Sequence, residues 1–279
     1  MDYKTILVHC DASQAVAHRL GLAVGLARRF DAHLIGLYTR PQFESSMLFN
    51  GDSAMGRYYA VFEESAKADQ AVALAAFTKA SKGAEVSSEW RAVNGFPDTA
   101  LVAASYCADL TVVGQADSGT TRTMPTPSNL AELVALSAAG PVMIVPHAGV
   151  RSAPGKTVLL CWKDTREAAR AVSAALPLLK SADEVIALAV GERESASGHA
   201  EPGAELALWL ARHGVKVTVR RDAAIGGDVG ALILSCAADQ GADLIVMGIY
   251  GHSRLRELVL GGVSRTLLGG MTVPLFMAH

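Results

Sequence analysis

A glycine-rich segment near the end of the chain has the residue types of a phosphate-binding loop. The apolar run Ala242-Asp-Leu-Ile-Val-Met-Gly248 leads into Gly251, Gly261 and Gly262 with the spacing G-x2-G-x9-G-G, at the start of a helical stretch. Glycines let the backbone approach an anion closely, exposed N–H groups donate to phosphate oxygens, and a following helix adds its positive end. The segment therefore predicts phosphate binding.

Polar side chains inside this segment have two interpretations. His252 and Arg254 are candidates for phosphate contact or partner recognition, because a guanidinium matches the geometry of a phosphate. The alternative is a solvated, charged helix start in which Arg256 and Glu257 form a local pair.

Other catalytic patterns are weaker. The chain has no G-x-x-x-x-G-K-[ST] or G-x-S-x-G motif, and no Mg²⁺-binding carboxylate is evident at the glycine segment, so fast hydrolysis is not supported. Slow turnover of a bound nucleotide stays open. His9-Cys10-Asp11 could suggest a metal or nucleophile cluster, but further spaced ligands are missing. The simpler interpretation of His9 and Cys10 is a strand with one residue facing inward and one outward.

The elements that position these residues occur twice. Lys4-Thr-Ile-Leu-Val-His-Cys10 matches Lys156-Thr-Val-Leu-Leu-Cys-Trp162, and Ala108-Asp-Leu-Thr-Val-Val-Gly114 matches the run that ends at Gly248. Pro141-Val-Met-Ile-Val145 likewise matches Pro274-Leu-Phe-Met-Ala278. Three matches in the same order indicate an internal duplication.

Each half alternates short apolar runs with helical stretches. Strands are expected near residues 4–9, 32–38, 85–92, 109–114 and 142–146, and near 156–162, 184–190, 215–220, 242–248 and 273–277. Helices are expected near residues 14–29, 60–81, 98–107, 128–138, 165–179, 202–213, 228–239 and 255–268. This order predicts α/β domains with a parallel sheet covered on both faces. We expect two tandem, doubly wound, five-stranded domains, at 1–150 and 151–279, with Arg151 to Gly155 as the linker.

One segment breaks the symmetry of the repeat. The offset between the halves falls from 152 at the first match to 134 at the second, so the first half has extra residues, and Pro41 to Phe62 supplies them. The simpler interpretation is a long surface loop; a lid or an interface is the functional alternative.

The quoted motifs resemble the universal stress protein family over essentially the whole chain. The spacing Gly248-x2-Gly251-x9-Gly261 is similar to the phosphate loop of the ATP-binding branch of that family. The resemblance implies a Rossmann-like fold of the adenine nucleotide alpha hydrolase type, with ATP as ligand and Mg²⁺ as the metal that would accompany it.

The resemblance also implies a set of nucleotide contacts. Base and ribose would be held at the ends of the first two strands of the second half, and ribose and phosphates by the glycine segment. The implied residues, with the two polar candidates of that segment, are Cys161, Trp162, Lys163, Val190, Met247, Gly248, Gly251, His252, Arg254, Gly261, Gly262, Val263 and Ser264.

Two positions depart from the family pattern. Gly262 stands where ATP-binding members usually have Ser or Thr, which removes one side-chain hydrogen bond, worth about 1–3 kcal/mol if the phosphate depends on it. Lys163 replaces the usual acidic or amide residue; it could reach a phosphate or point to solvent.

The first half lacks the glycine segment. Asp117 aligns with Gly251, where a carboxylate would repel phosphate, and Pro125 and Pro127 remove backbone donors, although Asp11 and Ser13 keep the family's Asp-x-Ser turn. We expect a domain that keeps the fold without binding a triphosphate; a different small ligand is the alternative. The family resemblance further implies that the last strands of the halves pair within one chain as a pseudo-dimer, and a homodimer of two chains is a further option.

Composition narrows the remaining classes. The net charge is −2 without a long basic stretch, which argues against a nucleic-acid or anionic-membrane partner. The N-terminus does not resemble a secretory signal, no membrane span is evident, and the four cysteines show no CxxC spacing, so we expect reduced, buried thiols and a cytoplasmic location. The family resemblance implies a stress-response sensor or adaptor that binds an adenine nucleotide, which is the leading hypothesis; a nucleotide-free interaction scaffold and a slow ATPase are the alternatives.

Overall fold

The computed structural model describes residues 2–40, 53–116, 127–150, 153–190, 203–222, 227–249 and 262–279. Within these ranges, the strands are β1 (Thr5–Cys10), β2 (His33–Arg40), β3 (Ser88–Asn94), β4 (Leu110–Gly114), β5 (Val142–Val145), β6 (Thr157–Trp162), β7 (Glu184–Val190), β8 (Val217–Asp222), β9 (Leu244–Gly248) and β10 (Leu275–Ala278). The helices are α1 (Val16–Phe30), α2 (Ser53–Lys82), α3 (Pro97–Ser105), α4 (Leu130–Ser137), α5 (Arg166–Lys180), α6 (Ala204–Arg212), α7 (Val229–Asp239) and α8 (Gly262–Gly270). The predicted α/β class is confirmed.

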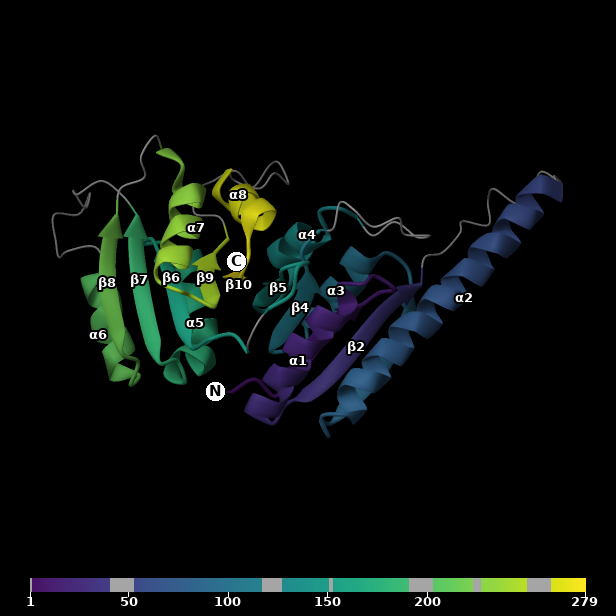
Figure 1. The fold of residues 1–279 in the computed structure, drawn as a ribbon, viewed down its shortest axis with the longest axis horizontal. Helices are drawn as coiled ribbons and strands as arrows, with labels where there is room; N and C mark the ends of the chain where they lie inside the picture. Colours follow the sequence, from purple (N-terminus) through teal and green to yellow (C-terminus); the bar gives the residue numbers. More distant parts are fainter. Residues whose placement is uncertain are drawn as a thin grey trace.

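All ten strands form a single sheet with the order β3-β2-β1-β4-β5-β10-β9-β6-β7-β8. Neighbours within each half are parallel, and the halves meet where β5 and β10 pair antiparallel, with Phe276 opposite Met143. The predicted pairing of the last strands is therefore confirmed, and the two halves lie side by side along this seam (Figure 1).

Two apolar cores cover the two faces of the sheet. One is built against α1, α2, α5 and α6, and the other against α3, α4, α7 and α8. Burial on both faces explains why the strands read as continuous apolar runs instead of alternating ones. It also corrects the expectation for β1, because His9 and Cys10 are both buried, at 3% and 0% exposure, instead of one facing outward.

A repeated aspartate anchors the first strand of each half. The carboxylate of Asp109, which immediately precedes β4, accepts hydrogen bonds from the backbone N–H groups of Lys4 and Thr5, at 2.7 and 2.9 Å. Asp243, which precedes β9, accepts likewise from Gly155 and Lys156 at 2.8 and 3.1 Å. The Ala-Asp-Leu repeat in the sequence therefore has a structural cause.

The extra residues of the first half are partly helical. Residues 53–59, expected in a surface loop, form the start of the 30-residue helix α2, while residues 41–52 lie outside the described part. This prediction was wrong because the segment extends a helix that β2 holds just beyond it: Glu63 pairs with Arg40, and the Tyr38 hydroxyl donates to the carbonyl of Ala66. Figure 1 shows α2 running past the end of the sheet.

Other boundaries differ little from expectation. Helix α8 begins at Gly262, and the residues 255–261 expected to precede it in the same helix lie outside the described part. No helix in the described ranges is long and apolar enough to cross a membrane.

Candidate functional site

The strand ends predicted to hold the base and ribose lie beside one another. Cys161 of β6 is in register with Met247 of β9, and Trp162 is in register with Ala189 of β7, one residue before Val190. In the order β9-β6-β7, the chain direction of strand addition reverses between β6 and β9. Open α/β sheets bind ligands at this kind of switch point, outside the carboxyl ends of the strands.

The end of β6 is held by local contacts. The Trp162 indole N–H donates to Asp164 at 2.9 Å, and the Thr165 hydroxyl caps α5 by accepting from the N–H of Ala168 at 3.3 Å. Lys163 between them is exposed. Burial raises the pKa of the Cys161 thiol to about 12, so this thiol is protonated near neutral pH and suits packing instead of nucleophilic chemistry.

Gly248 is needed by the fold itself. A Cβ at this position would lie 2.5 Å from the backbone nitrogen of Ala168 and 2.5 Å from the carbonyl carbon of Glu167. The first turn of α5 therefore packs directly on the end of β9, and only glycine leaves room for it. The first glycine of the predicted phosphate segment has this structural reason independent of any ligand.

Beyond the end of β9, the described part of the phosphate segment resumes at the start of α8. Gly262 is exposed and a Cβ there would meet nothing within 4 Å, Val263 is partly buried, and Ser264 is 6% exposed. The other end of α8 is tied to the first half, because the Gln115 side chain donates to the carbonyl of Leu268 at 2.7 Å. Sequence reasoning did not identify this contact between the halves.

Four predicted contact residues cannot be placed. Gly251, His252, Arg254 and Gly261 lie outside the described residues, as do Asp117 and Pro125 of the first half. The structure brings together the predicted residues on β6, β7 and β9. The contacts predicted for Gly251, His252, Arg254 and Gly261, between β9 and α8, remain predictions.

A groove of about 600 Å³ adjoins Trp162 between α5 and α6. Of the predicted contact residues that the structure describes, it includes Trp162 alone. Its other walls come from the two helices, with Val172 and Ser173 on one side and Leu206 and Trp209 on the other. The sequence analysis missed this groove, because the groove depends on how two helices pack beside each other, and no local sequence pattern shows this.

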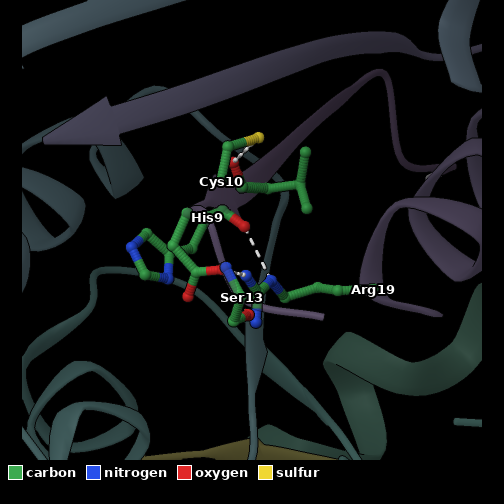
Figure 2. A network of polar contacts seen from close by, with 6 residues as sticks. His9, Cys10, Ser13 and Arg19 are labelled. Atoms are coloured by element: carbon green, nitrogen blue, oxygen red, sulfur yellow. Dashed lines mark hydrogen bonds and ion pairs between the residues drawn. The ribbon is translucent and has the colours of Figure 1, made fainter. Parts of the chain in front are cut away.

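The end of β1, which corresponds to the end of β6 in the second half, contains a buried polar network (Figure 2). Arg19, 3% exposed, donates from Nε to the carbonyl of His9 at 2.7 Å, and its Nη2 pairs with Asp11 at 2.9 Å. Asp11 also accepts from the backbone N–H of Ser13 at 3.0 Å and from the Ser13 hydroxyl. The Asp-x-Ser turn is thus present, but Arg19 was missed. A signal existed: Arg19 is a charged residue on the apolar face of α1, beside Leu20 and Ala23.

The cysteines differ in exposure and reactivity. Burial raises the pKa of the Cys10 thiol to about 12, while Cys107 is exposed and Cys161 is partly exposed, which corrects the expectation that all four thiols are buried. Among the described residues, no group of three His, Cys, Asp or Glu side chains is arranged to hold a metal ion.

Comparison with known proteins identifies the family. The sequence profile described as "Universal stress protein family" matches residues 2–146 and 155–279. A universal stress protein from Archaeoglobus fulgidus DSM 4304 is 18% identical with a TM-score of 0.74, and the match covers 98% of this chain and 95% of that one. The functionally unknown protein PA1789 from Pseudomonas aeruginosa PAO1 is 14% identical with a TM-score of 0.58, covering 99% and 92%.

No curated protein sequence matches the chain. At these identities the solved structures support the shared fold, and the family profile carries the assignment over both halves. The chain belongs to the universal stress protein family, as the tandem type with two Usp domains.

Proposed function

We propose that the second half binds an adenine nucleotide, with ATP as the leading candidate, at the carboxyl ends of β6 and β9. The supporting observation is the register of Cys161 with Met247 at the switch point of this half. These two residues are far apart in sequence, and the family resemblance assigns Cys161 to the base and ribose and Met247 to the ribose and phosphates. Their adjacency is what a shared pocket requires.

The phosphate part of the proposal rests on the ends of the glycine segment. It leaves the sheet at Gly248, and Gly262 is the first described residue of α8, where the backbone is exposed and an added Cβ would meet nothing within 4 Å among the described residues. Backbone N–H groups at such a terminus attract phosphate oxygens. Gly262 contributes no hydroxyl, so the backbone would supply the contact.

The wider role follows from family membership. We propose a stress-response sensor or adaptor, acting in the cytoplasm, for which nucleotide occupancy is the signal. Assembly of two chains into a homodimer is a further part of this proposal. Among the described residues at the site, Cys161 does not supply a nucleophile for rapid chemistry, since burial raises the pKa of its thiol far above neutral pH.

A nucleotide-free scaffold is a second candidate with an observation of its own. Packing of α5 against Gly248 explains that glycine without a ligand. In a scaffold, neither Lys163 nor Gly262 would contact a phosphate. A slow ATPase is the third candidate, and would be recognised by ADP accumulating with purified protein.

Mass spectrometry of the small molecules that co-purify with the protein tests the proposal. We expect ATP or ADP with the wild type and with Gly56→Asp, which adds the same charge where a Cβ meets nothing within 4 Å. Gly251→Asp, which copies the residue aligned in the first half, should lose the nucleotide. Nucleotide retained equally by Gly251→Asp would place any binding elsewhere.

A further inference from the structure

The first half has its own switch point, between β1 and β4. Its strand order β3-β2-β1-β4-β5 reverses direction there, as the order in the second half does between β6 and β9. An open α/β sheet leaves a crevice at this position, and a ligand ordinarily occupies it.

In the first half, a side chain of the chain itself lies in this position. The Arg19 guanidinium bonds to the carbonyl of His9 at the end of β1 and to Asp11 in the turn that follows. It also lies against the end of β4, because a Cβ added at Gly114 would collide with Nη1 of Arg19. One guanidinium therefore spans both strands at the switch point, as Figure 2 shows for the β1 side.

The second half has neither partner of this contact. The buried residues of α1 and α5 superimpose at an offset of 152, since Val16, Leu20 and Ala23 correspond to Ala168, Val172 and Ala175. At the same offset Arg19 corresponds to Ala171, which is fully buried, and Asp11 corresponds to Lys163. The cation and its carboxylate are therefore both features of the first half.

Retaining a charged pair here needs a reason beyond packing. A buried arginine costs desolvation unless hydrogen bonds and an opposite charge offset it, and Arg19 has both. Gly114 is also explained, since it leaves room for the guanidinium instead of for a ligand.

We infer that Arg19 is the built-in occupant of the first half's crevice and the residue that closes this half to external ligands. It distinguishes the two halves, because an internal cation lies at the switch point of the first half and Ala171 stands at the same position in the second. The inference does not depend on nucleotide binding by the second half.

The inference is tested by removing the Arg19 side chain and adding methylguanidinium from solution in its place. Arg19→Ala copies the residue of the second half and leaves a space lined by Asp11 and the carbonyl of His9. We expect its melting temperature to be lower than that of the wild type. Tens of millimolar methylguanidinium chloride should raise it by at least about 2 °C relative to the same concentration of sodium chloride. The wild type should gain nothing from methylguanidinium.

Two results would overturn the inference. One is an Arg19→Ala protein that folds but gains no stability from methylguanidinium over sodium chloride. If Arg19→Ala fails to fold, Arg19→Lys decides, because lysine keeps the charge without the fork that reaches both His9 and Asp11. We expect Arg19→Lys to fold with a lowered melting temperature that methylguanidinium does not change. A melting temperature equal to that of the wild type would contradict the fork's role.

Discussion

Single glycines at the two switch points show that a residue of a ligand-binding motif can be required by packing instead of by a ligand. Gly248 belongs to the predicted phosphate segment, yet the backbone of α5 already requires glycine there; Gly114 accommodates Arg19. The sequence correctly predicted that a strand ends at Gly248, because an apolar run followed by glycine is a local pattern. It could not predict the contact with Ala168, since that contact depends on how closely α5 packs against the end of β9.

We predict that Gly248→Ala lowers the free energy of unfolding by about 1–3 kcal/mol, because the new methyl group overlaps the first turn of α5. Urea titration followed by circular dichroism measures this loss. Gly21→Ala is the matched control: its Cβ on α1 meets nothing within 4 Å, and stability should be unchanged or slightly higher. A Gly248→Ala protein as stable as the wild type would mean that this glycine serves only a ligand.

Buried thiols predict a loss of stability at alkaline pH. Burial raises the pKa values of Cys10 and Cys161 from 9.0 to about 12. Between these values the unfolded chain has lost thiol protons that the folded protein keeps, so the stabilisation is complete below about pH 9 and declines as the pH rises towards 12.

The measurement is the free energy of unfolding in urea at a series of alkaline pH values. The double variant Cys10→Ala, Cys161→Ala should show a shallower decline than the wild type, because the other ionisable groups are common to both proteins. Equal slopes would contradict the assigned burial of these thiols.

At the scale of elements, the alternation of apolar runs and helical stretches predicted the order of strands and helices, because the inner strands are largely buried on both faces while every residue of the edge strands β3 and β8 is partly or fully exposed. It failed for residues 53–59, where the composition resembles a loop but the segment extends a helix that contacts β2 at Ala66. The repeated Ala-Asp-Leu was recognised as a repeat without its cause. The cause is the non-local contact of Asp109 and Asp243 with the first residues of β1 and β6.

We predict that Asp243→Ala costs about 1–3 kcal/mol of unfolding free energy, because the first N–H groups of the second half lose a charged acceptor. Asp239→Ala, at an exposed position at the end of α7, should cost little and serves as the control. Hydrogen exchange at Gly155 and Lys156 should accelerate only in Asp243→Ala. Unchanged exchange there would contradict the anchoring role.

The whole molecule is a pseudo-dimer whose halves share one sheet. Beyond the β5–β10 seam, the Tyr3 hydroxyl donates to the carbonyl of Ala174 at 2.7 Å, and Gln115 reaches α8. Each half therefore contributes to the core of the other. The seam was predictable from the family resemblance, whereas these side-chain bridges were not, because they join residues with no sequence relationship.

This shared core predicts one cooperative unfolding transition. Phe276 of β10 is fully buried at the seam, and Phe276→Ala should cost about 3–5 kcal/mol. Calorimetry should then show a single transition at a lower temperature. Two separate transitions, only one of them shifted, would contradict the shared core.

The central claim is that the second half alone binds an adenine nucleotide, and calorimetric titration of the full-length protein with ATP tests it most directly. The structure of the two switch points predicts one site per chain, because Arg19 lies at the switch point of the first half while the buried Ala171 stands at its position in the second. A single site, abolished by Gly251→Asp and retained by Gly56→Asp, is the expected result. No binding at millimolar ATP, or two equivalent sites per chain, would contradict the account.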